Sequence, residues 1–367
     1  MFHPSLSALP VACGQLIVGG FTGERAPASF AAALSRGTLG GAILFARNLT
    51  GHVAQVAELT AQLRAAAARD LPPPIVSIDQ EGGRVARIPA PALVLPPMRA
   101  LGDRGTPALA ERVARAQARE LAALGFTMNF APVLDVDTNP ANPVIGDRAF
   151  SSDAERVALF GAAYVRGLQS GGVLACGKHF PGHGDTALDS HYALPKVTHT
   201  LDRLDQVELV PFRAAIHAGV SSIMTAHILC SSLDAERPAT LSRAACTTLL
   251  RGELGFEGVI VSDDLEMKAI TDRYSIEEAA TGAIDAGCDL LLICSDEALQ
   301  ERARVALVAR AEEDTAFHAR CQDALARVLR MRRRLPAQQA LHVRELHTVV
   351  GGDESRRVAE ELAKVMA

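Results

Sequence analysis

The sequence has no tryptophan, and aromatic residues make up only 4% of its 367 residues. An excess of basic charge is also missing, since 37 Lys and Arg stand against 42 Asp and Glu, a formal net charge of −5. Proteins that bind nucleic acid usually present a basic patch and aromatic side chains on which bases stack. The composition therefore predicts that nucleic acid is not a partner.

Long apolar runs and a targeting leader are missing too. No stretch approaches the roughly 20 consecutive apolar residues that a membrane-spanning helix needs, so we expect no membrane span. The first 20 residues, MFHPSLSALPVACGQLIVGG, contain no basic leader, and Gly14 and Gln15 interrupt their apolar run. We therefore predict no signal peptide.

The seven cysteines include no C-x-x-C pair. Cys176, Cys288 and Cys294 lie in or beside strand-like runs, which favours buried free thiols in a reducing compartment. A content of 49% hydrophobic residues is enough to bury the core of one large α/β domain or of two smaller ones. The composition as a whole predicts a soluble, globular, cytoplasmic protein.

Eight short apolar runs recur along the chain. They are QLIVGG from Gln15, GAILFA from Gly41, PIVSID from Pro74, TMNFAPVLDV from Thr127, VLACGKHF from Val173, SSIMTAH from Ser221, GVIVSDD from Gly258 and DLLLICS from Asp289. The runs are continuous rather than alternating, which is typical of strands that are covered on both faces, as in parallel sheets.

Amphipathic helical patterns separate most of these runs. One begins at Pro107 and stops at Gly125, a second begins at an Asp153 cap and ends at glycines, and SIEEAATGAIDAG from Ser275 forms a third. Eight β/α units predict an α/β protein with a closed (β/α)₈ TIM-like barrel. A doubly wound open sheet is the alternative, because the pattern does not reveal the order of the strands.

We assign residues 1–335 to the barrel domain and residues 336–367 to a C-terminal tail with one additional helix. That helix begins at about Asp353 and has Val358, Leu362 and Val365 on one stripe. We expect the stripe to pack against the barrel, with binding of a partner as the alternative.

Ionisable residues follow several predicted strands directly. They are Asp79 at the end of the third run with Glu81 just after it, Lys178 and His179 in the fifth, His227 in the sixth, and Asp263 and Asp264 in the seventh. Active sites of TIM barrels lie at the carboxyl ends of the strands. Because two acids are adjacent in the seventh run, we predict that Asp263 projects into the barrel mouth and that Asp264 caps or supports the turn.

The segment KHFPGHGDTALDSHYALP, from Lys178 to Pro195, is too polar and too rich in Gly and Pro for a strand or a helix face. Within it, Asp189 and His191 are two residues apart, so an extended backbone places them on the same side. Asp189 would then hold one ring nitrogen of His191 and leave the other to transfer a proton. An ordinary solvated loop is the alternative.

The same segment contains the H-x-x-x-H spacing of His179 and His183, which on a helix would suggest zinc. Pro181, Gly182 and Gly184 oppose a helix there, so we predict no metal site. The segment also lacks the G-K-[ST] ending of a phosphate-binding loop. We therefore expect no metal and no cofactor.

Five polar groups, Asp79, Arg87, Arg148, Lys178 and His179, are expected near one rim of the barrel. Such side chains bind carbohydrate hydroxyls through paired hydrogen bonds. Lys178 and Arg148 would alternatively suit a phosphate or a carboxylate, and Arg148 alone is equally compatible with an ordinary surface residue.

Four segments carry a resemblance to a known family. IDQEGGRVAR, DTNPANPVIGDRAF, KHFPGHGDTALDSH and VSDDLEM occur in the order found in glycoside hydrolase family 3. From near Gln15 to about Arg334 the chain is most similar to the single-domain bacterial β-N-acetylglucosaminidases of peptidoglycan recycling. KHFPGHGDT followed closely by DSH is the most specific of these segments.

The resemblance implies a retaining glycosidase on a TIM-like barrel. Asp263 matches the nucleophile of the family, and His191, oriented by Asp189, matches the acid/base. Contacts to N-acetylglucosamine in the −1 subsite are implied for Asp79, Arg87, Arg148, Lys178 and His179. The implied partner is a small carbohydrate that ends in N-acetylglucosamine, such as a muropeptide fragment, and the sequence specifies no oligomeric state.

Other functions stay open at this point. A phosphorylase or a β-glucosidase would use the same fold. A metal-dependent hydrolase would use His179, His183 and Asp185 as metal ligands. A non-catalytic barrel would bind a sugar without turning it over. The tail from about Leu341 resembles the segment that leads into the second domain of two-domain relatives. It is therefore either the natural end of a barrel-only enzyme or the start of a truncated domain.

Overall fold

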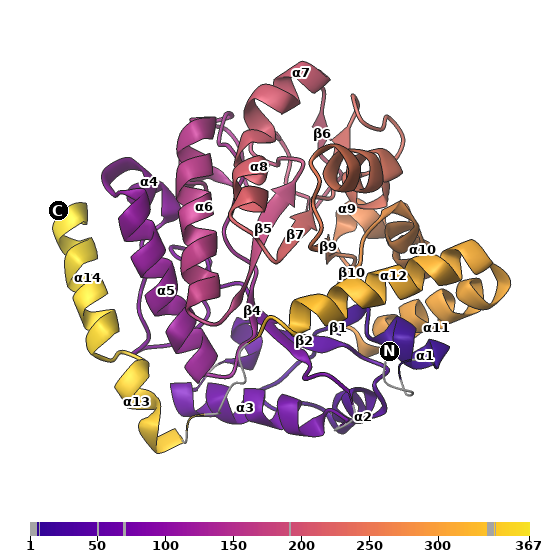
Figure 1. Ribbon diagram of the computed structural model, residues 1–367, viewed down its shortest axis with the longest axis horizontal. Helices are drawn as coiled ribbons and strands as arrows, with labels where there is room; N and C mark the ends of the chain where they lie inside the picture. Colours follow the sequence, from indigo (N-terminus) through magenta and orange to yellow (C-terminus); the bar gives the residue numbers. More distant parts are fainter. Residues whose placement is uncertain are drawn as a thin grey trace.

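The computed structural model describes residues 6, 8–49, 51–68, 71–190, 192–335, 341 and 343–367. A closed barrel of eight parallel strands lies at the centre of the molecule (Figure 1). Its strands are β1 (Ile17–Gly19), β2 (Gly41–Leu44), β3 (Ile75–Ile78), β4 (Met128–Asn129), β5 (Leu174–Phe180), β7 (Ser222–Thr225), β9 (Val259–Asp264) and β10 (Leu290–Ile293). Because β10 pairs with β1, the predicted barrel is confirmed and the open sheet is wrong.

Helices surround the barrel and connect its strands (Figure 1). The α-helices are α1 (Leu9–Gly14), α2 (Ala28–Arg36), α3 (Val53–Ala66), α4 (Met98–Arg104), α5 (Pro107–Ala123), α6 (Ala154–Ser170), α7 (Leu201–Arg203), α8 (Val210–His217), α9 (Lys268–Thr271), α10 (Ile276–Ala286), α11 (Glu297–Glu313), α12 (Thr315–Arg332), α13 (Leu346–Val349) and α14 (Asp353–Met366). Shorter 3₁₀ segments are η2 (Ala46–Asn48), η3 (Gly146–Arg148), η5 (Ala239–Leu241) and η7 (Val343–Glu345), and π-helical segments are η4 (Leu204–Glu208) and η6 (Ala244–Glu253). Strands β6 (Lys196–Val197) and β8 (Leu229–Cys230) pair with each other in the loops that follow β5 and β7.

The predicted helix starts have the expected caps. The Asp153 carboxylate accepts a hydrogen bond from the Arg156 N–H at the start of α6. Ser275 and Glu278 form a reciprocal capping box at the start of α10. These side chains satisfy N–H groups that have no partner within the helix, and so they place the helix starts.

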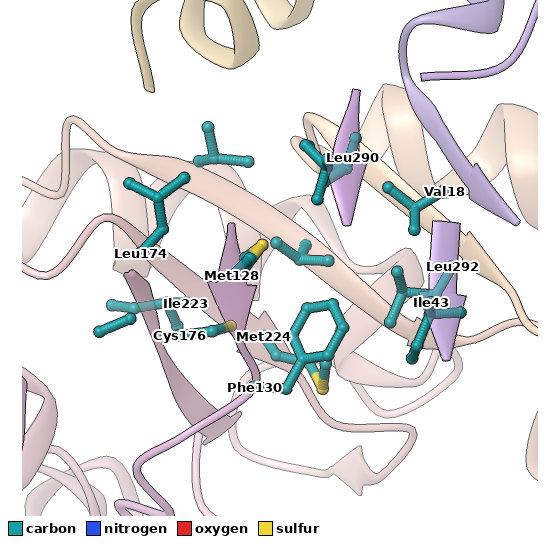
Figure 2. Close-up of a cluster of buried hydrophobic side chains, with 14 of the residues drawn as sticks. Val18, Ile43, Met128, Phe130, Leu174, Cys176, Ile223, Met224, Leu290 and Leu292 are labelled. Atoms are coloured by element: carbon teal, nitrogen blue, oxygen red, sulfur yellow. The ribbon is translucent and has the colours of Figure 1, made fainter. Parts of the chain in front are cut away.

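Apolar side chains from strands all round the barrel pack together (Figure 2). The residues labelled in that figure on barrel strands are Val18, Ile43, Met128, Leu174, Cys176, Ile223, Met224, Leu290 and Leu292, all of them buried. Burying one such side chain stabilises a fold by roughly 1.5–3 kcal/mol. Since the interior is filled, the barrel is a packed core with a closed floor, and any binding site has to lie at its end.

The fourth strand is much shorter than the apolar run that predicts it. The run extends from Thr127 to Val136, but regular pairing covers only Met128 and Asn129. Pro132 has no N–H to donate to a ladder, and beyond it only Val133 pairs, as an isolated bridge with Lys178. Irregular hydrogen bonds to β5 continue past this point, because the Pro132 carbonyl oxygen accepts the Lys178 N–H at 3.1 Å and the Leu134 N–H donates to the Lys178 carbonyl oxygen at 2.6 Å. Asp135 therefore follows directly on a segment that is still bound to β5.

Two further expectations concern cysteines and membrane spans. All seven cysteines are buried and free, as predicted for Cys176, Cys288 and Cys294. In the part of the chain that the structure describes, every helix is too short or too polar to cross a bilayer.

The C-terminal segment packs on the outside of the barrel. Helix α14 lies at the edge of the molecule beside α5 and α4 (Figure 1). Val358 and Leu362 are buried and Val365 is partly buried against the core, so the predicted stripe is a packing face. The segment also contains the short helix α13, which the sequence did not predict, whereas residues 336–340 and 342 lie outside the described residues.

Glu120 on α5 joins this segment to the loop after β3. Its carboxylate accepts hydrogen bonds from the N–H of Leu93 at 2.7 Å and of Gly351 at 2.8 Å, and from the Ser355 hydroxyl. Leu93 belongs to the loop that also carries Arg87. The C-terminal segment and a loop of the barrel mouth therefore share one buried carboxylate.

We expect Glu120→Ala to lower the free energy of unfolding by about 1–3 kcal/mol, because it leaves buried donors without an acceptor. Urea denaturation of the purified protein measures this. The matched control is Glu360→Gln, at an exposed position of α14, which should change stability by less than about 0.5 kcal/mol. Equal stabilities of the Glu120 and Glu360 variants would contradict the role of Glu120.

Candidate active site

A cavity of about 200 Å³ opens at the carboxyl ends of the barrel strands. Its polar lining comes from the ends of β3, β5 and β9 and from the loops that follow β3, β4 and β5. These residues are Asp79, Glu81, Arg87, Arg148, Lys178, His179, His183, Ser190, Asp263 and Asp264. The cavity therefore lies where the sequence predicts an active site.

Four charged side chains form a network on one wall of the cavity. Lys178 Nζ lies 2.6 Å from both Asp79 Oδ1 and Glu81 Oε1. Arg148 binds the same Glu81 carboxylate through Nε at 2.9 Å and Nη2 at 2.8 Å. The Glu81 side chain is only 2% exposed, so the two cations replace the water that its charge would otherwise need.

Burial and pairing act in opposite directions on these groups. Burial by itself raises the pKa of Glu81, but the charges of Arg148 and Lys178 outweigh it and hold that pKa far below its usual range. Burial by itself lowers the pKa of Lys178, and the carboxylates of Asp79 and Glu81 reverse this, so the pKa is raised. Lys178 and Glu81 are thus both charged at neutral pH.

Arg148 reaches this network from η3. Asn142 Oδ1 accepts hydrogen bonds from the N–H groups of Val144 and Ile145, both at 2.8 Å, just before η3. Val144 and Ile145 pack in a small buried cluster with Val133. An asparagine turn and a local apolar contact therefore fix the backbone that aims Arg148 at Glu81.

Asp135 organises the start of the polar loop after β5. Its carboxylate lies 2.7 Å from His179 Nδ1 and accepts the His183 N–H at 2.6 Å. Burial raises the pKa of Asp135, but the charge and hydrogen bond of His179 outweigh it, so the pKa is lowered. With Nδ1 held in this way, His179 has Nε2 left for a ligand in the cavity.

Asp263 ends β9 at the cavity. Its Oδ1 accepts the N–H of Asp264 at 2.8 Å, and among the described residues Oδ2 has no hydrogen-bond donor. Burial raises the pKa of Asp263, but the charge of His227 followed by that of His179 outweighs it, and the net pKa is lowered. Asp263 is therefore an oriented, ionised carboxylate with one oxygen available.

Hydrogen bonds made by His227 and Asp264 hold the backbone at the end of β9. His227 Nε2 donates to the Asp264 carbonyl oxygen at 2.9 Å, and Nδ1 lies 2.7 Å from Thr240 Oγ1. Asp264 Oδ1 accepts the N–H groups of Glu266 and Cys294 at 3.1 and 3.2 Å. Asp264 therefore supports the turn through these contacts, while both acids line the cavity. The catalytic role predicted for Asp263 stays a prediction.

A family model for the glycosyl hydrolase family 3 N-terminal domain matches residues 9–331 of the chain. The chain belongs to glycosyl hydrolase family 3. The family resemblance seen in the sequence is thereby confirmed, and the cavity at the barrel mouth becomes the candidate active site of a family 3 enzyme.

Named relatives agree with this membership. A β-hexosaminidase of Pseudomonas aeruginosa is 43% identical over 273 residues, which cover 73% of this chain and 79% of the relative. A β-N-acetylglucosaminidase of family 3 from Paenibacillus has a TM-score of 0.89 at 41% identity, over 98% of this chain and 68% of that one. NagZ from Neisseria gonorrhoeae, solved with N-trifluoroacetyl-D-glucosamine, has a TM-score of 0.79 at 32% identity, over 96% and 98% of the two chains.

In this family 3 protein, the structure brings most of the predicted site residues together. Six of them line the one cavity: Asp79, Arg87, Arg148, Lys178, His179 and Asp263. Asp189 directly precedes the lining residue Ser190. His191 lies outside the described residues, so its predicted role stays a prediction.

The three groups named for a metal-dependent hydrolase do not converge. Asp185 Oδ2 lies 2.7 Å from His199 Nε2, and Asp185 Oδ1 accepts a hydrogen bond from the Thr138 hydroxyl at 2.8 Å. Both ring nitrogens of His183 face hydroxyl groups, and His179 Nδ1 faces Asp135. Within the described residues, no three His, Cys, Asp or Glu side chains are arranged as metal ligands.

Two residues of the site, Glu81 and Asp135, are absent from the predicted set. In the sequence, Glu81 is only one of the polar residues that follow Asp79, but in the structure it is the acceptor shared by Lys178 and Arg148. Asp135 stands in the sequence LDVD, where nothing marks it as the partner of two histidines 44 and 48 residues away. Its position as the one ionisable residue within a largely apolar predicted strand is the available signal.

The raised pKa of Asp264 leads to a prediction about how the stability of the protein depends on pH. Burial, together with the charges of Glu266 and Asp263, raises its pKa from 3.8 to about 7. A carboxyl whose folded pKa is raised binds protons more tightly in the folded state, so the folded state loses stability as pH rises from about 4 to 7. Asp264→Asn removes this loss.

We therefore expect the variant to gain stability relative to wild type, by about 1–3 kcal/mol, as pH rises from 4 to 7 and to gain nothing more above pH 7. Denaturant unfolding at several pH values measures the difference. A difference that is constant over this range would contradict the raised pKa.

Proposed function

We propose that this family 3 enzyme is a retaining exo-β-N-acetylglucosaminidase. It would release terminal N-acetylglucosamine from cell-wall fragments such as muropeptides. The observation that carries the proposal is the single cavity in which the ionised Asp263 faces the network of Asp79, Glu81, Arg148 and Lys178. The names of the similar proteins support the choice of sugar.

Several features support recognition of one terminal sugar. The barrel floor beneath the cavity is filled by apolar side chains, so a glycan would enter by its end rather than by its middle. Lys178 and Asp79 offer a donor and an acceptor side by side, as paired sugar hydroxyls require. The buried Nε of Arg87 has no hydrogen-bond partner among the described residues, so it is a donor that a sugar hydroxyl would satisfy.

In the proposed first step, a carboxylate oxygen of Asp263 attacks the anomeric carbon. The bond from that carbon to the leaving oxygen breaks, and His191, as imidazolium, donates its proton to this oxygen. The sugar is then bound covalently to Asp263. The lowered pKa of Asp263 keeps the nucleophile ionised at neutral pH.

In the second step, water attacks the same carbon while His191, now neutral, takes its proton, and the bond to Asp263 breaks. Two inversions at one carbon retain its configuration. Asp189 would orient His191 and stabilise its cationic form. Most retaining glycosidases use two carboxyl groups, so an imidazole in the second role distinguishes this proposal.

Trapping of the intermediate tests the nucleophile. We expect an activated 5-fluoro N-acetylglucosaminyl donor to inactivate the enzyme and to add one sugar mass to the peptide that contains Asp263. Peptide mass mapping locates the label. Asp263→Asn should take up no label, whereas Asp272→Asn, at an exposed position outside the cavity, is the control that keeps it. A label on any other residue would refute the mechanism.

Leaving-group dependence tests the acid/base. We expect His191→Ala to lower kcat/KM about 10²–10⁴-fold on substrates with a poor leaving group, because these need protonation of the departing oxygen. The loss should be far smaller on activated aryl glycosides, whose leaving groups depart without a proton. Equal losses on both substrates would remove His191 from this role.

A further inference from the structure

His183 is buried at 1% exposure, and both of its ring nitrogens face hydroxyl groups. Nδ1 lies 2.7 Å from Thr186 Oγ1, and Nε2 lies 3.1 Å from Ser190 Oγ. Its main-chain N–H is bound by Asp135. With every polar atom of the ring engaged, this imidazole is suited to holding its neighbours rather than to transferring protons with a substrate.

The protonation state of His183 fits this role. Burial, followed by the charge of His179, lowers its pKa to about 4, so the ring is neutral at neutral pH. A neutral imidazole donates through one nitrogen and accepts through the other, and a hydroxyl can take either part. Thr186 and Ser190 therefore satisfy the ring completely without a charge.

Ser190 is fastened on two sides. Ser190 is 2% exposed and lines the cavity. Its hydroxyl lies 3.1 Å from His183 Nε2. Its carbonyl oxygen accepts the N–H of Ala269 at 3.3 Å, in α9, which follows the strand that carries Asp263. Ser190 thus connects the polar loop after β5 to the segment that follows β9.

The backbone around Ser190 forms a closed turn. The Asp189 carbonyl oxygen accepts hydrogen bonds from the N–H groups of Tyr192 at 3.0 Å and Ala193 at 3.1 Å. Ser190 lies inside this turn and next to Asp189. Whatever fixes Ser190 therefore also fixes the backbone from which Asp189 projects.

We propose that His183 is a positioning residue that acts through Ser190 and sets the place of the Asp189 turn relative to Asp263. The inference rests on the proposed function, in which Asp189 and its neighbour His191 serve the transfer of the proton. In that case a loosened turn impairs protonation of the leaving group and leaves the attack by Asp263 nearly unchanged.

The first test is Ser190→Ala, which removes one hydroxyl and no packing volume of note. We expect kcat/KM to fall about three- to tenfold on a substrate with a poor leaving group, as loss of one neutral hydrogen bond implies. On an activated aryl glycoside the value should change less than twofold. Ser222→Ala is the matched control, because Ser222 is equally buried but donates to the Ala175 carbonyl oxygen away from the cavity.

The second test compares two replacements of His183. The Asn amide takes the place of Nδ1 and reaches Thr186 only, whereas the Gln amide takes the place of Nε2 and reaches Ser190. We expect His183→Asn to show the same leaving-group dependence as Ser190→Ala, and His183→Gln to restore part of the loss. The double variant His183→Asn/Ser190→Ala should be no worse than His183→Asn alone, because both remove the same contact.

The outcomes separate this inference from the proposed function. Thermal melting first confirms that each variant is folded. If His191→Ala shows the leaving-group dependence but Ser190→Ala and His183→Asn reduce both substrates equally or not at all, the positioning role is refuted and the function stands. If wild type releases no N-acetylglucosamine from either substrate, the proposed function itself fails.

Discussion

The mouth of the barrel depends on the buried Glu81 carboxylate between Lys178 and Arg148. These residues come from the end of β3, the end of β5 and η3, which are far apart in sequence. Removing one partner of such a group leaves a buried charge uncompensated, which costs about 3–5 kcal/mol. This electrostatic constraint therefore holds the loop after β3, the end of β5 and η3 in one arrangement, and it fixes the orientation of Lys178 and Asp79 at the cavity.

The interior of the barrel and its open end differ in composition. Apolar side chains fill the interior (Figure 2). The carboxyl ends of the strands and the loops after them carry the charged groups that line the cavity. Asp135 holds the start of the polar loop through its contacts with His179 and His183. His183 in turn contacts the Ser190 hydroxyl. A chain of buried hydrogen bonds thus leads from the packed core to the turn at Asp189, where the proposed proton transfer takes place.

The fold was readable from the sequence because it depends on repeated local patterns. Each of the eight apolar runs contains one barrel strand, and the Asp153 and Ser275 caps begin helices as predicted. The pattern was less accurate for the fourth strand, where regular pairing covers only Met128 and Asn129 although the apolar run continues to Val136. Pro132, which has no N–H to donate, lies in the irregular part of this run. The short helix α13 had no periodic signal long enough to predict it.

The sequence by itself determined the eight β/α units, the family resemblance and the strand ends at which ionisable residues gather, since strand periodicity and short motifs are local properties of the chain. Closure of the sheet into a barrel was decided by the pairing of β10 with β1. Only the tertiary structure decided which charges meet. Glu81 with Arg148, and Asp135 with His179, pair across 67 and 44 residues. Such pairing depends on where parallel strands end in space and on how burial and neighbouring charges set each pKa, and neither can be read from the order of residues.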